Sequence, residues 1–179
     1  MAPKQLPVRP TTDFAKTALF NILANHFDFE ETSLLDLFSG TGNISYEFGS
    51  RGCEDITAVD SNSGCVKFIS ETFKKLGMNS AKTIRADAFR FIESCNHSYD
   101  IVFADPPYEM ETTDNIPEAV FKKKLLKENG WLIVEHQSKR KLKSSIEPDE
   151  VRVYSNCAFS IFKSKGNRVQ GSEFKVQSL

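Results

Sequence analysis

Short apolar runs alternate with helical patterns along most of the chain. Apolar runs typical of buried strands cover about residues 34–38, 56–60, 83–87, 99–104 and 131–135. Apolar residues at helical spacing predict helices over about 13–27, 44–50 and 63–76, a short helix through 91–92, and a helix from about 117 to the glycine at 130. Strands that alternate with single helices predict an α/β domain with a parallel, doubly wound sheet.

The two ends of this pattern differ from its middle. Thr11 and Thr12 can cap the first helix, whose predicted apolar face comprises Phe14, Ala18, Leu19, Ile22 and Leu23. After the fifth strand, two strands over about 150–154 and 157–162 follow with no helix between them, which predicts an antiparallel hairpin at one edge. We therefore expect seven strands, mostly parallel, with helices on both faces.

Domain organisation is simple. We expect an extended arm over residues 1–10, one domain over 11–162 and a flexible tail over 163–179, which is polar and aperiodic. The chain of 179 residues is long enough for one domain with a full core.

Composition agrees with a soluble globular protein, because 40% of residues are hydrophobic and 26% are charged. The formal charge of −1 supplies no overall positive field, so a nucleic-acid surface would have to be a local basic patch. There is no membrane-spanning run and no signal peptide, and no Cys or His has metal-ligand spacing. We expect a cytoplasmic protein without a metal, whose thiols are buried: Cys53, Cys65, Cys95 and Cys157.

The chain is organised around Asp105-Pro106-Pro107-Tyr108, which follows the strand at 99–104. Two prolines stop a strand, because neither donates to a ladder and each fixes φ. The turn therefore lies at the carboxyl end of a strand, where open α/β sheets bind ligands. It offers the Asp105 carboxylate, the Pro106 carbonyl and the Tyr108 ring, a set that suits a flat group carrying an NH2. The plainer interpretation is a rigid turn with a surface tyrosine.

A second candidate site joins the first strand to the next helix. Gly40 and Gly42 follow Asp36 and let the backbone approach a ligand at a helix amino terminus. The motif is not a complete G-x-G-x-x-G, because Ser45 replaces the third glycine, and no P-loop Lys-Ser/Thr is present. Asp60 ends the second strand at roughly the 20-residue offset of a ribose-binding acid.

Asp87 ends the third predicted strand and could accept a hydrogen bond from an adenine amine. The three acids then meet at one edge of the sheet. The plainer alternatives are a tight turn for the glycines and helix amino-caps for Asp60 and Asp87.

Three stretches together resemble a known family. They are Arg9-Pro10-Thr11-Thr12-Asp13 with the helix after it, 35–42, and 105–108. The sequence looks like a class I S-adenosylmethionine-dependent methyltransferase and is similar to the RsmD family over about residues 6–162. The last two stretches occur in amino-group methyltransferases generally, and the first narrows the resemblance to RsmD.

The resemblance implies a Rossmann-like fold, S-adenosylmethionine as cofactor, and methyl transfer to the exocyclic N2 of a guanine in 16S rRNA, of the guanine 966 type. It implies a monomer that acts on 16S rRNA or the small ribosomal subunit. The implied amine-binding residues are Asp105, Pro106, Pro107 and Tyr108. The implied cofactor-binding residues are Asp36, Phe38, Ser39, Gly40, Gly42, Asn43, Asp60, Ser61, Asp87, Ala88 and Asp105.

The same resemblance places RNA contacts on the arm and the first helix, at Arg9, Thr11, Thr12 and Lys16. A second basic run, 139–143, is either a further RNA contact or a solvated loop. Family members usually begin with a basic β-hairpin before the arm, whereas this sequence starts almost at the arm. In the family, that hairpin would be expected to help hold RNA.

Three other functions use parts of the same pattern. An adenine-N6 methyltransferase on DNA or RNA uses the same Asp-Pro-Pro-Tyr turn. Enzymes that methylate a protein glutamine amide usually carry asparagine at the position of Asp105, which disfavours that alternative. A cofactor-binding RNA scaffold without catalysis would not need an amine-binding turn.

Overall fold

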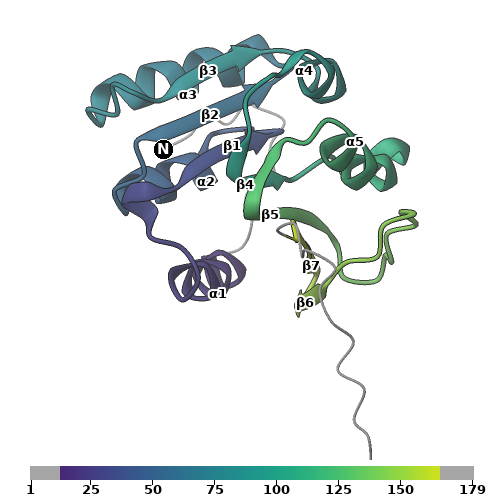
Figure 1. The fold of residues 1–179 in the computed structure, drawn as a ribbon. Coiled ribbons are helices and arrows are strands. Elements are labelled where there is room, and N and C mark those ends of the chain that lie inside the picture. Colours follow the sequence, from purple (N-terminus) through teal and green to yellow (C-terminus); the bar gives the residue numbers. More distant parts are fainter. Residues whose placement is uncertain (1–12, 166–179) are drawn as a thin grey trace, which may run out of the picture.

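One seven-stranded sheet forms the centre of the computed structural model, which describes residues 13–165. Its strand order is β3-β2-β1-β4-β5-β7-β6 (Figure 1). The strands are β1 (Ser33–Leu37), β2 (Asp55–Asp60), β3 (Lys82–Arg85), β4 (Tyr99–Ala104), β5 (Leu126–Gln137), β6 (Glu150–Tyr154) and β7 (Cys157–Lys163). The helices are α1 (Asp13–Ala24), α2 (Asn43–Ser50), α3 (Ser63–Lys75), α4 (Ala88–Ser94) and α5 (Ile116–Lys122), with short 3-10 turns η1 (Phe29–Glu31) and η2 (Glu111–Asn115).

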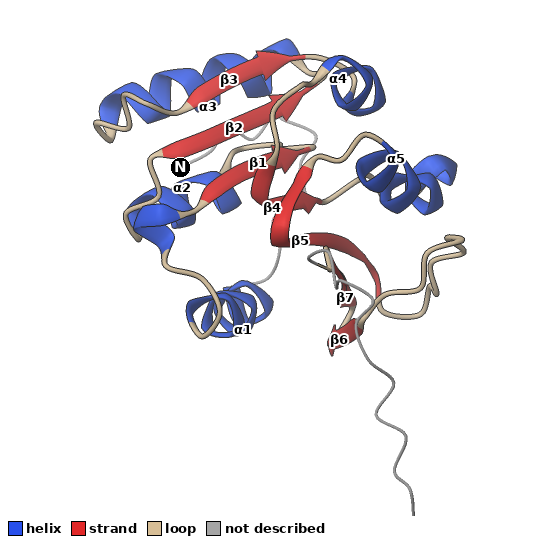
Figure 2. Ribbon diagram, viewed as in Figure 1, coloured by secondary structure: helices blue, strands red, loops and turns tan. Residues whose placement is uncertain are grey.

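Strand directions confirm the predicted fold class. The first five strands pair in parallel, and β7 lies antiparallel between β5 and β6 (Figure 2). The order reverses between β1 and β4, which is the switch point where open α/β sheets bind ligands. A seven-stranded sheet of this kind is the Rossmann-like fold that the sequence pattern predicts.

Helices cover both faces of the sheet. Buried residues of α1, α2 and α3 pack with one set of strand side chains, and those of α4 and α5 pack with the alternate set (Figure 1). On β1, for example, Leu34 belongs to the first core and Leu35 to the second. In the described part of the chain, no helix has both the length and the apolar character needed to cross a membrane.

The prediction of one long helix over about 117–130 is wrong. Helix α5 ends at Lys122, and β5 begins at Leu126. Lys124 has φ 56° and turns the chain, after which the Leu125 carbonyl accepts from the Tyr99 amide at 2.8 Å. Short apolar runs have the same composition in buried helices and strands, so pairing with β4 decides the outcome here.

Other boundaries shift by a few residues. Helix α1 ends at Ala24 rather than near residue 27, and Phe14 is 74% exposed instead of part of its buried face. The third strand ends at Arg85, so Asp87 lies beyond it. The stretch 109–115, for which no element is predicted, contains η2.

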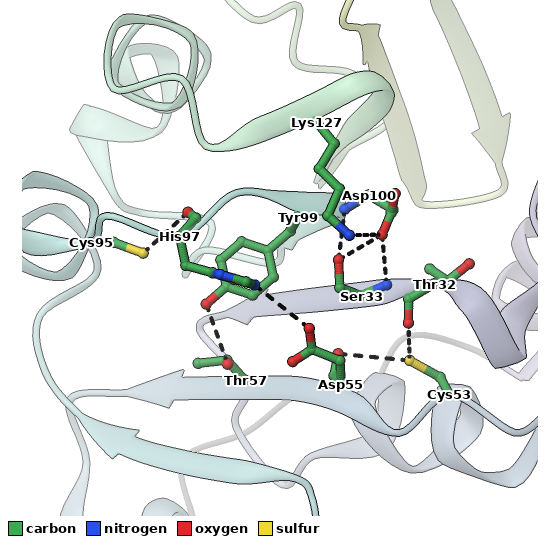
Figure 3. A network of polar contacts seen from close by, with 10 residues as sticks. All are labelled: Thr32, Ser33, Cys53, Asp55, Thr57, Cys95, His97, Tyr99, Asp100 and Lys127. Atoms are coloured by element: carbon green, nitrogen blue, oxygen red, sulfur yellow. Dashed lines mark hydrogen bonds and ion pairs between the residues drawn. The ribbon is translucent and has the colours of Figure 1, made fainter.

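A polar cluster holds the amino ends of three strands together (Figure 3). We call Ser33, Asp100 and Lys127, from β1, β4 and β5, the amino-edge cluster. Asp100 Oδ2 accepts from the Ser33 amide at 2.8 Å, from Ser33 Oγ at 2.6 Å and from Lys127 Nζ at 2.8 Å. This cluster lies at the sheet edge opposite the carboxyl ends of the strands.

Candidate active site

A cavity of about 530 Å³ opens at the carboxyl edge of the parallel strands. Turns that follow β1, β2, β3 and β4 contribute to its wall, as does the end of β5. Thirteen residues predicted for the site line it: Asp36, Phe38, Ser39, Gly40, Asn43, Asp60, Ser61, Asp87, Ala88, Asp105, Pro106, Pro107 and Tyr108. The structure therefore brings both predicted motifs together in one cavity.

The turn after β1 is held tightly against β2. The Ser39 amide donates to the Val59 carbonyl at 2.9 Å, and Ser39 Oγ lies 2.7 Å from the Asp36 carbonyl oxygen. Phe38 and Gly40 both have positive φ, of 61° and 54°. The left-handed conformation costs a residue with a side chain more than it costs glycine, so glycine suits the second position.

Asp36 forms the buried floor of the cavity, with 2% of its surface exposed. Ser45 Oγ donates to Asp36 Oδ2 at 2.6 Å, so the residue that replaces the third glycine of the motif orients this carboxylate. Burial nevertheless raises the pKa of Asp36 to about 7, since desolvation outweighs the Ser45 hydrogen bonds. A cationic ligand group beside it would favour the ionised form.

Asp60 connects two turns of the cavity wall. Its Oδ2 accepts from the Gly40 amide and its Oδ1 from the Asn62 amide, both at 2.8 Å. Asn62, rather than Asp60, caps α3 by accepting from Gly64 and Cys65. Each carboxylate oxygen can accept more than one hydrogen bond, so Asp60 can also receive ligand hydroxyl groups.

Asp87 caps helix α4, because its Oδ1 accepts from the Arg90 amide at 3.1 Å. The interpretation of Asp87 as a helix amino-cap is thus correct. Asp87 and Ala88 also line the cavity, so capping and ligand binding are compatible here.

Gly42 is the one predicted cofactor residue that does not line the cavity. It has φ 80°, precedes α2, and a Cβ atom built on it would lie 2.7 Å from the Tyr46 ring. Its neighbour Asn43 lines the cavity and accepts from Lys16 Nζ at 3.1 Å. Gly42 therefore suits the tight packing of the turn, and its contact with a cofactor stays a prediction.

The Asp105–Tyr108 turn forms the part of the cavity wall that follows β4. Pro106 is buried, Pro107 is exposed and Tyr108 is partly exposed. Arg140 ties the following loop down, because its guanidinium donates to the Tyr108 carbonyl at 3.5 Å and to the Met110 carbonyl at 3.4 Å. It also pairs with Asp114 at 3.2 Å. Arg140 thus has a structural role in the loop that carries the tyrosine.

The predicted RNA contacts are only partly visible. Arg9, Thr11 and Thr12 lie outside the described residues. Lys16 has a side chain that is 17% exposed and pairs with Glu47 at 3.4 Å. In the second basic run, Lys139, Lys141 and Lys143 are exposed, and these residues could still meet a polyanion. RNA binding by either group stays a prediction.

Sequence reasoning missed three residues on the far side of the cavity. Glu135 lies on β5, two residues before its end, and is 3% exposed; Asn156 lies in the β6–β7 turn, and Cys157 begins β7. The apolar run 131–134, followed directly by an acid, could have identified Glu135 from the sequence. The other two depend on the antiparallel register that pairs Gln137 with Cys157, which no sequence pattern reveals.

The arrangement combines a buried carboxylate, a glycine turn and the Asp105–Tyr108 turn, whose oxygens can accept hydrogen bonds, around one space. Within residues 13–165, no group of three or more His, Cys, Asp or Glu side chains could hold a metal ion. A cavity of this size falls in the range of pockets that enclose a nucleoside-sized ligand.

Comparisons with known proteins place this geometry in a family. A family model described as Conserved hypothetical protein 95 matches residues 1–157. The chain is similar to Ribosomal RNA small subunit methyltransferase D of Buchnera aphidicola subsp. Baizongia pistaciae, at 29% identity over 73% of this chain and 66% of the relative. It is also similar to the protein of the same name from Escherichia coli K12, at 30% identity over 72% of this chain and 64% of the relative.

Solved structures show the same fold. An RNA methyltransferase from Salinibacter ruber, in complex with S-adenosyl-L-homocysteine, superposes with a TM-score of 0.66 at 14% identity, over 95% of this chain and 100% of that one. A conserved hypothetical protein from Streptococcus pyogenes superposes with a TM-score of 0.74 at 26% identity, over 84% and 95%. The matched region spans about two thirds of the two curated relatives.

Proposed function

The chain belongs to the RsmD family, described as Conserved hypothetical protein 95, and from this we propose that it transfers a methyl group from S-adenosylmethionine to the exocyclic N2 of a guanine in 16S rRNA. The guanine 966 position is the proposed target. The observation that carries the proposal is the single cavity shared by Asp36, Gly40 and the Asp105–Tyr108 turn.

The residues present fit S-adenosylmethionine. Asp36 offers a buried carboxylate beside Gly40, whose positive φ and missing side chain leave room for a ligand's methionine part. Asp60 lies one strand away with oxygens that can accept ribose hydroxyls, and Asp87 and Ala88 lie at the next strand for the adenine. When bound, this cofactor supplies an electrophilic methyl group on a sulfonium.

The amine-binding turn then makes a weak nucleophile reactive. The N2 lone pair of guanine is delocalised into the ring, so the free amine attacks poorly. The Asp105 carboxylate and the Pro106 carbonyl accept its two N–H hydrogens and direct the lone pair toward the methyl group. Positioning of this kind needs neither a metal nor a covalent enzyme intermediate.

The base must leave its stack to enter the cavity, at a cost of a few kcal/mol. Tyr108, which lines the cavity and is partly exposed, offers a ring for the base to stack on. Such stacking contributes about 1–3 kcal/mol and offsets much of that cost. The arm residue Arg9, the Thr11–Thr12 pair and Lys16 are proposed to hold the surrounding RNA.

Mass spectrometry of ribosomal RNA tests this function directly. Cells that lack the gene should lose one N2-methylguanosine from 16S rRNA, and a plasmid copy of the gene should restore it. A plasmid copy carrying Asp105→Ala should not. Loss of an N6-methyladenosine instead would favour the adenine methyltransferase that shares this turn, and an unchanged rRNA would reject the proposal.

The stage of ribosome assembly can be tested with purified protein. The proposed partners are 16S rRNA or the small ribosomal subunit, acted on by a monomer. Labelled methyl transfer to bare rRNA and to subunits from the deletion strain would separate these two substrates.

A further inference from the structure

Glu135 is a buried acid that has no part in the methyl transfer proposed above. It lines the cavity and is 3% exposed. The four residues before it, 131–134, are buried and apolar. The acid therefore appears on β5 at the point where the strand reaches the cavity.

Strand order places Glu135 on the side of the cavity away from the cofactor residues. Asp36 is on β1, Asp105 follows β4 and Glu135 is on β5, and these strands are neighbours in the order β1-β4-β5. Asp105 therefore lies between the other two acids. The turns after β2 and β3, with Asp60 and Asp87, lie beyond Asp36.

Register brings Glu135 next to the amine-binding turn. Ala104 pairs with Val134, so Asp105, the residue after β4, comes next to the position of Glu135 on β5. Adjacent strands are about 4.8 Å apart, which is within reach of one planar base. Phe103 and Ile133, two residues earlier on each strand, belong to the same core, so the two acids share a face.

Two neighbouring carboxylates match one nucleobase edge. Guanine presents N2–H2 and N1–H side by side, which are both donors. Adenine presents its amine beside N1, which is an acceptor and would face a carboxylate lone pair. A site built to pair with a donor rejects an analogue that lacks it.

We propose that Glu135 selects guanine over adenine by accepting the N1–H hydrogen while Asp105 and Pro106 hold the N2 amine. This inference rests on the proposed function and names the residue that sets its substrate class. Glu135 is a specificity-determining residue, because it contacts the base without taking part in methyl transfer.

The test exchanges one acceptor for a donor on the protein and the N1–H donor for an acceptor on the base. Small subunits are reassembled around 16S rRNA with guanosine or 2-aminopurine riboside at the target, and labelled methyl transfer is measured. 2-Aminopurine keeps the N2 amine but carries a lone pair at N1. Glu135→Gln keeps one neutral acceptor oxygen but loses the charge, so it should reduce kcat/KM for guanosine about threefold to tenfold. The variant should lose little or nothing on 2-aminopurine, because the amide can donate to N1.

Glu128→Gln is the matched control, because Glu128 is an exposed acid on the same strand and lies outside the cavity. It should leave the preference for guanosine unchanged. S-adenosylmethionine affinity, measured by calorimetry, should be the same for both variants and the unmodified protein. A Glu135→Gln protein that keeps the original preference, or that loses cofactor binding, overturns the inference.

The unmodified protein supplies a second test that does not depend on the variant folding. It should transfer methyl groups to guanosine much faster than to 2-aminopurine or to N1-methylguanosine. Equal rates would overturn the role of Glu135 and leave the proposed function intact. No transfer to guanosine at all would reject the proposed function itself.

Discussion

At Asp105, removal of one carboxylate should separate cofactor binding from methyl transfer. Asp105→Ala should lower kcat by about 100-fold or more, because the amine loses its orienting acceptor. S-adenosylmethionine affinity should change little, since Asp36 and Asp60 remain. Single-turnover transfer and calorimetry measure the two quantities. Asp105→Asn, which keeps one acceptor oxygen, should lose less activity, and unchanged turnover in the alanine variant would reject the assignment.

Asp36 should make cofactor affinity depend on pH near neutrality. Its pKa is raised by burial to about 7, so the carboxylate is mostly protonated at about pH 6 and mostly ionised at about pH 8. The cationic cofactor favours the ionised form, so affinity should rise roughly tenfold across that interval. Asp36→Asn should bind weakly with no such rise, and a flat profile for the unmodified protein would contradict the prediction.

The same group has the opposite effect on stability without ligand. A folded-state pKa above the unfolded value means that the folded state holds the proton more tightly. The contribution is full below the usual pKa of 3.8 and is lost as pH rises through about 7. Stability measured without cofactor should therefore fall over this window relative to Asp36→Asn.

Single residues in motifs were the most predictable part of the site. Asp36, Asp60 and Asp105 could be located because each lies at or next to the end of a strand whose apolar run is visible in the sequence. Glu135 also follows such a run, but its place beside Asp105 depends on the order of strands. Gly42 matched the motif, but the sequence did not show that Tyr46 and Ile69, from two different helices, crowd it.

At the scale of elements, the start of α2 depends on Gly42. Gly42→Ala should destabilise the fold by about 2–4 kcal/mol, because the residue has φ 80° and the new Cβ would lie 2.7 Å from the Tyr46 ring. Chemical denaturation measures the free energy of unfolding. Gly77→Ala is the matched control: φ is 72° and nothing lies within 4 Å, so it should cost only about 1–2 kcal/mol. Equal costs at both positions would contradict the packing argument.

Elements with a clear period or cap were predicted well, and those defined by pairing were not. Helix α3 covers Ser63–Lys75, close to the predicted 63–76, with Asn62 as its cap and Gly77 shortly after its end. The segment 123–130 looked helical because Leu125 and Leu126 continue an apolar period, but hydrogen bonds to β4 draw it into β5. Phe14 fitted the helical face, yet it packs on Tyr154 of β6, with ring centroids 6.2 Å apart.

At the scale of the whole molecule, the two edges of the sheet have different tasks. The amino-edge cluster connects β1, β4 and β5, and the cavity lies at the other ends of the same strands. Burial alone would raise the pKa of Asp100, but hydrogen bonds from Lys127 and Ser33 outweigh it and hold the pKa below its usual value. This lowered pKa marks the carboxylate as a stabilising group.

Asp100→Ala should therefore reduce stability by about 1.5–3 kcal/mol without changing cofactor affinity. Because the folded-state pKa is lowered, the stabilisation is present above about pH 4 and is lost as pH falls through the folded-state value. Urea denaturation at several pH values measures both effects. Lys127→Ala, which removes a partly exposed ion pair alone, should cost less than about 1 kcal/mol. A loss of cofactor affinity in Asp100→Ala would show that the two edges are coupled.

The division of the carboxyl edge has a consequence for how such proteins diversify. Strands β1, β2 and β3 come first along the chain and form one side of the sheet. Strands β4 to β7 come later and form the other side. The proposed methyl-donor residues are therefore encoded mainly in the first half of the gene, and the proposed nucleobase-binding residues in the second. Recombination near the codons for α4 could combine a new nucleobase preference with an unchanged set of cofactor-binding residues.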